Sequence, residues 1–157
     1  MLDLVFNNFT KTLKYGRGFF ENVINEAVWT LGLKQKVEIS VNLVGSARIR
    51  ALNKKYRGKD KPTDVLSFPL QTRTHADRTQ TFAKKTLGGI INLGDIFICL
   101  PIAENYALKE GVGLSYKLAF LTVHGFLHLL GYDHEKTLSD KKKMFELQSK
   151  IIKKLDY

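Results

Sequence analysis

The sequence is poor in cysteine, in acidic side chains and in long apolar runs. Its single cysteine, Cys99, excludes an internal disulfide and suits a reducing cytoplasm. Cys99 ends an apolar strand pattern, so we interpret it as a buried thiol and not as a ligand. The most apolar segment, 118–130, is too short to span a bilayer. The first residues lack the basic flank and apolar core of a signal peptide. We therefore expect a cytoplasmic protein without a membrane partner.

The shortage of acidic residues leaves a strong positive charge. Fifteen Asp and Glu stand against 25 Lys and Arg, which gives a formal net charge of +10 and a pI near 9.7. Such an excess favours polyanions, nucleic acid first and anionic membranes second. Charge alone is weak support, because many small basic domains bind no nucleic acid.

The length of the chain and its apolar patterns predict one α/β domain spanning residues 1–157. The chain length fits a single core, and 44% hydrophobic with 25% charged residues is ordinary for a folded protein. Strands are predicted at 2–6, 37–43, 64–68 and 90–98, with clear alternation of apolar residues in 37–43 and a continuous, buried apolar pattern in the last. Helical periodicity covers 18–31, 47–56, 102–110, 114–130 and 140–155, with Ser46 as a plausible N-cap. We predict a mixed sheet of about four strands layered with helices, in an order that the sequence does not reveal.

Residues 71–88 show no apolar periodicity and are interpreted as an exposed excursion. His75 lies within this segment, and we expect it to take no part in metal binding.

The most informative stretch is 124–134, which reads HGFLHLLGYDH and holds three of the four histidines. His124 and His128 are four apart on a predicted buried helix, so their side chains point the same way. Gly131 permits the left-handed backbone that commonly ends a helix, and the chain can then bring His134 back toward them. Three neutral imidazoles with one side open describe a catalytic zinc site, here at the end of a central buried helix.

A single histidine on an apolar helix is usually a hydrogen-bonded core residue. Burying two imidazoles on one helical turn costs free energy unless their nitrogens have partners, and a shared metal ion would be such a partner. The spacing is that of the metzincin proteases, whose motif has a glutamate general base directly after the first histidine. Here that position is Gly125. A peptidase with this geometry would lack its base, which favours another hydrolysis.

The stretch 56–69, YRGKDKPTDVLSFP, combines a charged loop with a short strand. The sequence leaves two interpretations open: a solvated surface turn, or a cleft lined by Arg57, Asp60, Thr63 and Asp64. The role of Asp133 is also left open, because its carboxylate can either orient an imidazole or cap the turn.

With these motifs and LGDIFIC at 93–99, the sequence resembles the YbeY family of metal-dependent, single-strand-specific endoribonucleases. The resemblance covers nearly the whole chain. It implies His124, His128 and His134 as ligands of one Zn²⁺ ion and Arg57 as a functional, catalytic residue. It also implies a cytoplasmic role in rRNA maturation at the 16S 3′ end and in ribosome quality control, with the small ribosomal subunit as partner. We expect a monomer.

Two features depart from the family pattern. The excursion at 71–88 is longer and more basic than expected, and lysines follow His134 where relatives often carry acids. Two other functions are weighed against the nuclease: a metal-stabilised RNA-binding assembly factor with little cleavage, and a residual metallopeptidase. The RNA site, the nucleophile and the general acid are not readable from the sequence.

Overall fold

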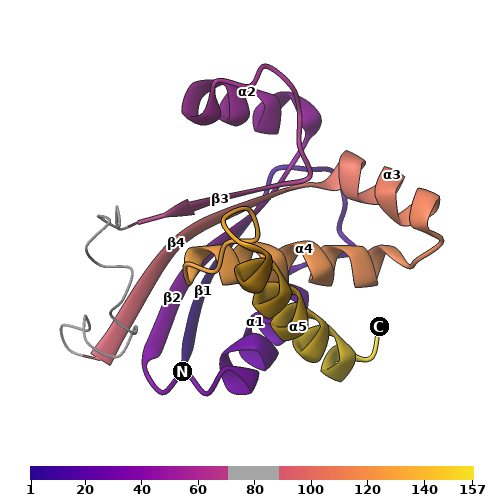
Figure 1. Ribbon diagram of the computed structural model, residues 1–157. Coiled ribbons are helices and arrows are strands. Elements are labelled where there is room, and N and C mark those ends of the chain that lie inside the picture. The colour runs from indigo at the N-terminus through magenta and orange to yellow at the C-terminus, as the bar shows by residue number, and fades with distance from the viewer. Residues whose placement is uncertain (71–88) are drawn as a thin grey trace.

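The protein is built around a four-stranded sheet (Figure 1). The structure is a computed structural model, and it describes residues 1–70 and 89–157. The predicted excursion at 71–88, with His75, lies outside the described residues. The strands are β1 (Leu2–Asn8), β2 (Lys36–Val44), β3 (Val65–Pro69) and β4 (Ile90–Cys99). The helices are α1 (Arg17–Thr30), α2 (Ser46–Arg57), α3 (Leu100–Glu110), α4 (Leu114–Leu129) and α5 (Leu138–Leu155).

The predicted α/β class and four-stranded mixed sheet are confirmed. Every expected strand and helix begins and ends within two residues of its expected bounds. The Ser46 cap was wrong, because Gly45 is the N-cap of α2 and Ser46 is already helical. The N-cap residue must have an extended backbone, which Gly45 has and Ser46 does not. Glycine is accepted at this position although it has no side chain to accept a hydrogen bond.

The strands lie in the order β1-β2-β4-β3. β1, β2 and β4 are parallel, whereas β3 pairs antiparallel with β4 and forms an edge. The register between β2 and β4 shifts after Glu38, where Gly94 has a φ of +106°. A side chain at Gly94 would overlap the Phe68 carbonyl oxygen of β3. The positive φ of Gly94 accompanies the irregular pairing of β2 with β4, and the lack of a side chain there lets β3 lie close against β4.

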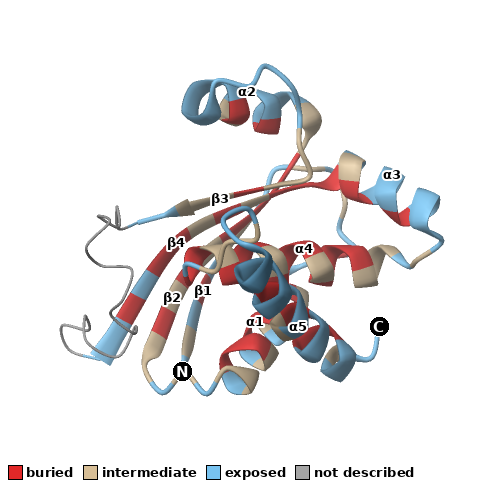
Figure 2. Ribbon diagram, in the orientation of Figure 1, coloured by how far each residue is buried: buried red, intermediate tan, exposed pale blue. Residues whose placement is uncertain are grey.

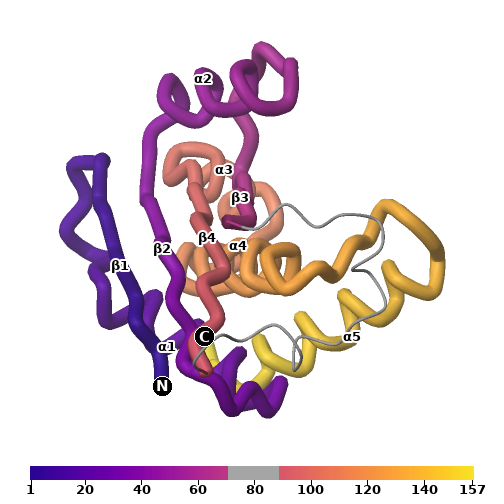
Figure 3. The backbone as a smooth tube through the Cα atoms, turned by 90° about the vertical axis from the view of Figure 1, so that its left-hand side faces the viewer, coloured from indigo at the N-terminus to yellow at the C-terminus, as the bar shows by residue number. Residues whose placement is uncertain are grey.

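Helices α1 and α4 pack against one face of the sheet, and α5 packs outside them (Figures 1 and 3). α4 is the central buried helix that was predicted, and Figure 2 colours most of it as buried. α2 lies on the other side of the sheet, over a smaller cluster made of Val44, Ile49, Leu66 and Cys99. The thiol of Cys99 is fully buried, as expected. None of the helices in 1–70 and 89–157 has the length and apolarity needed to cross a membrane.

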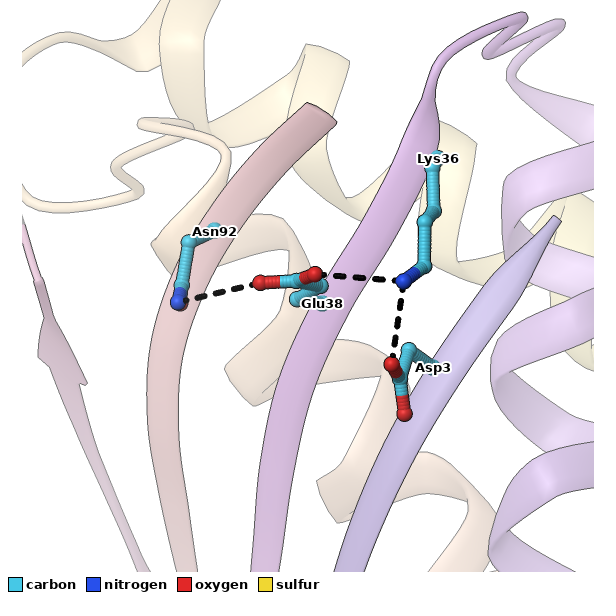
Figure 4. Close-up of polar contacts among 4 residues, drawn as sticks. All are labelled: Asp3, Lys36, Glu38 and Asn92. Atoms are coloured by element: carbon cyan, nitrogen blue, oxygen red, sulfur yellow. Dashed lines mark hydrogen bonds and ion pairs between the residues drawn. The ribbon is translucent and has the colours of Figure 1, made fainter. Parts of the chain in front are cut away.

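The sheet also has a polar surface, where three strands are linked by side chains (Figure 4). The Lys36 ammonium group donates to Asp3 Oδ2 at 3.1 Å and to Glu38 Oε1 at 3.3 Å. Asn92 Nδ2 donates to Glu38 Oε2 at 3.4 Å. The bond to Asp3, followed by that to Glu38, raises the pKa of Lys36. These contacts join β1, β2 and β4 through polar side chains on one surface of the sheet.

Candidate metal centre and cleft

α4 and the turn after it bring the three predicted histidines together. His124 and His128 are one helical turn apart, and their Nε2 atoms lie 3.1 Å from each other. Gly131 has a φ of +91°, so the chain reverses there as expected. The reversal brings His134 back, and one nitrogen from each ring lies within 4.8 Å of the other two. The three histidines are thus positioned to hold a metal ion.

The chemistry of this donor set fits a cation. Two nitrogens bound at 2.0–2.1 Å to one tetrahedral metal are about 3.3 Å apart, close to the His124–His128 separation. Burial, and then the neighbouring His124 and His134, lowers the pKa of His128 to about 4. Burial likewise lowers the pKa of His124. Both imidazoles are therefore neutral at pH 7, which is the form that binds metals.

Gln148 of α5 contacts the ring nitrogen of His124 that lies away from the other histidines. Its side chain is buried, with Oε1 3.2 Å from His124 Nδ1, while its Nε2 donates to the Phe120 carbonyl oxygen at 3.2 Å. The second bond fixes the amide so that Oε1 accepts from Nδ1–H and leaves Nε2 of His124 free for a metal. The sequence prediction missed this residue. Its signal was a polar side chain on the apolar face of α5, between Met144 and Ile151.

Replacing Gln148 with methionine, which has a similar volume but no comparable acceptor, is expected to lower the affinity for a metal ion by about 10- to 100-fold. The imidazole would lose the group that fixes its ring orientation and tautomer. Competition titration against a chelating dye measures the affinity, and melting temperatures check the fold. Gln148→Glu keeps an acceptor and should retain most of the affinity, and Lys142→Ala on the exposed side of α5 is the matched control. Wild-type affinity in the methionine variant would show that Gln148 only fills space.

A cleft of about 640 Å³ opens beside the histidines, along the edge strand β3. One wall is formed by residues 56–57 and 63–69, and the other by the three histidines with Asp133 and Glu135. Arg57 is the last residue of α2, and the helix ends at Gly58 in the left-handed conformation. The stretch 56–69 therefore forms a short strand and a cleft wall, not merely a surface turn.

The charged residues of this stretch do not all face the cleft. Arg57, Thr63 and Asp64 line it, but Asp60 does not. The Asp60 carboxylate instead accepts from Arg50 Nε at 2.8 Å and from Lys54 Nζ at 3.3 Å. Within residues 1–70 and 89–157, no carboxylate lies at ion-pair distance from Arg57. In these residues Arg57 therefore forms no ion pair with Asp60 or Asp64, although both are close to it in the sequence.

Asp133 caps the turn. Its Oδ1 accepts from the Glu135 backbone N–H at 2.9 Å, and its Oδ2 pairs with Lys136 at 3.4 Å. The bond to Glu135 is the main cause of the lowered pKa of Asp133. Of the two interpretations left open by the sequence, the contacts favour the cap.

Gly125 allows α4 to approach the sheet closely. A Cβ atom there would lie 3.0 Å from both Ile96 Cγ2 and Ser67 Oγ. The Ser67 hydroxyl donates to the Gly125 carbonyl oxygen at 3.3 Å. The position that carries a general base in the metzincin motif is therefore a packing contact in this protein.

The chain is similar to known proteins in both sequence and fold. The family model described as Endoribonuclease YbeY matches residues 6–156. An Endoribonuclease YbeY of Sulfurihydrogenibium sp. is 44% identical over 144 residues, which cover 92% of this chain and 84% of the relative. One from Geobacillus thermodenitrificans is 42% identical over 134 residues, covering 84% and 81%. The solution structure of a Thermotoga maritima protein superposes with a TM-score of 0.61 at 30% identity, covering 96% of this chain and 87% of the other.

Proposed function

Because this chain belongs to the YbeY family of endoribonucleases, we propose that it hydrolyses single-stranded RNA in the cleft beside β3. One zinc ion would be held there by His124, His128 and His134. The observation that carries the proposal is the placement of these three imidazoles and Arg57 around one cleft. We assign the whole chain, 1–157, to one catalytic domain.

A zinc ion with three histidine ligands supplies a Lewis acid that can activate a water molecule near neutral pH. The protein contributes the orientation of the ligands. Gln148 fixes the His124 ring, and the Asp133 cap fixes the turn that carries His134. Neutral imidazoles leave the positive charge of the ion undiminished at the reaction centre.

Arg57 is proposed to act on the phosphate. Cleaving a phosphodiester concentrates negative charge on the phosphate oxygens, and a planar guanidinium group can donate two parallel hydrogen bonds to them. Arg57 is exposed and lines the same cleft as the three histidines. It is therefore placed to bind a phosphate that reaches the metal.

We further propose that the substrate is rRNA of the small ribosomal subunit, with cleavage at the 16S 3′ end in maturation and quality control. The support is family membership together with the net charge of +10. From family membership we also propose that the protein acts in the cytoplasm and as a monomer.

Incubating zinc-loaded protein with a single-stranded RNA and with its duplex tests the function. We expect metal-dependent fragments from the single strand and few from the duplex, with binding that weakens steeply as salt rises. Chelated protein is the matched control, and sequencing of fragment ends locates the cut. Binding without metal-dependent scission would favour the assembly-factor alternative. Cleavage of casein without action on RNA would favour the peptidase.

A further inference from the structure

We propose that Tyr56, supported by Phe68, is a stacking site for one unpaired nucleobase of the RNA, next to the phosphate that reacts. The inference rests on the proposed function and adds a physical basis for selecting single strands. We call these two residues the stacking wall. Neither contributes to the metal centre.

The stacking wall is a supported aromatic surface. Ring centroids of Tyr56 and Phe68 are 5.0 Å apart with an interplanar angle of 57°. Phe68 packs in turn edge-on against Phe97 of β4, at 5.7 Å and 75°. Phe68 and Phe97 also pack on the small core beneath α2. Tyr56 therefore rests on groups that belong to the sheet and to this core.

Tyr56 is nevertheless 58% exposed, although it is a large ring with an apolar face. Tyr56 and Phe68 both line the cleft that contains the three histidines, and Tyr56 directly precedes Arg57. A base stacked on Tyr56 would thus be adjacent to a phosphate bound by Arg57. The cleft volume of about 640 Å³ lies in the usual range for sites that bind small ligands.

Charge around the stacking wall matches a polyanion. The Lys55 ammonium group lies 5.2 Å from the Tyr56 ring centroid. Lys55, Arg57, Lys59 and Lys61 are all exposed within six residues of Tyr56. An aromatic platform among cations is the arrangement by which proteins bind single-stranded nucleic acid, because every base has a face that can stack. A paired base keeps its faces against its neighbours in the duplex, so it cannot occupy this site.

The test uses a single-stranded oligonucleotide that the wild-type protein cleaves, and a series in which one base at a time around the cut is removed. Binding is measured by fluorescence anisotropy with chelated protein, so that the RNA stays intact. Tyr56→Ala should weaken binding of the intact strand by about 5- to 150-fold. Tyr56→Phe keeps the ring and should restore most of the affinity.

The abasic series separates stacking from support of the fold. Wild-type protein should lose affinity when one particular base is removed. The affinity of the Tyr56→Ala variant should not change when that same base is removed. A general structural defect would weaken every oligonucleotide alike. Trp29→Ala is the matched control, since Trp29 is a 77% exposed aromatic of α1 that does not line this cleft.

Two outcomes would overturn the inference while leaving the nuclease intact. One is unchanged affinity in Tyr56→Ala. The other is equal sensitivity of wild type and Tyr56→Ala to each abasic position. Failure of the wild-type protein to cleave RNA at all would instead overturn the proposed function.

Discussion

Replacing His128 with alanine is expected to remove the metal and to lower RNA cleavage by about 10³-fold or more. Metal ions supply several kcal/mol of charge stabilisation in such reactions, and each 1.36 kcal/mol corresponds to about tenfold in rate. His128 Nε2 lies 3.1 Å from His124 Nε2, so its loss removes one of the two closest donors. His124→Ala and His134→Ala should behave alike, because two donors do not complete the site.

Elemental analysis of purified protein measures the metal, and single-turnover cleavage measures the rate. His75→Ala is the control, because His75 is the one histidine outside the motif, and it should retain both. Full metal content in all three motif variants would refute the ligand assignment. A fall in melting temperature with wild-type metal content would show instead that the histidines serve the core.

Arg57→Ala is expected to lower the single-turnover rate at saturating RNA by about 10²-fold or more, as does the loss of a preorganised donor to a developing charge. Affinity should fall only modestly, since many exposed lysines share the attraction. Arg57→Lys should recover little, because an ammonium group lacks the bidentate geometry of the guanidinium. Melting temperature should not change, because Asp60 is already bound by Arg50 and Lys54 and does not need Arg57.

The decisive comparison is single-turnover cleavage beside thermal melting. Lys142→Ala is the charge-matched control, because Lys142 is exposed on α5 and does not line the cleft. It should weaken RNA binding slightly and leave the saturated rate unaltered. A fully active Arg57→Ala would end the catalytic role. Loss of activity together with metal and melting temperature would make Arg57 a structural residue.

The sequence predicted the elements well because their signals are local. Alternation in 37–43 and the glycine at 131 act on neighbouring residues, and both gave the correct structure. The histidine cluster was also predictable, since its members lie within eleven positions. The position of a helix N-cap is less predictable from local signals, because Gly45 and not Ser46 is the N-cap of α2.

What could not be predicted depends on contacts between distant parts of the chain. The strand order places β4 between β2 and β3, and nothing in either strand states its neighbours. Gln148 reaches His124 across 24 positions, so only the packing of α5 on α4 reveals its role. Asp60 and Arg57 are three residues apart with opposite charge, yet Arg50 and Lys54 bind the carboxylate, because α2 turns them toward it.

The cleft has one wall built locally and one built at long range. The three imidazoles lie within 124–134, so bringing them together closes only a short loop. The wall with Arg57 reaches them only when β3 is paired with β4, through contacts distant in the chain. Short loops close at lower entropic cost, and edge strands open before central elements. A molecule with a frayed edge would therefore retain its metal and lose its nuclease activity. Metal content would then report that α4, the turn with His134 and the packing of α5 are intact, and only RNA cleavage would report that β3 is in place as well.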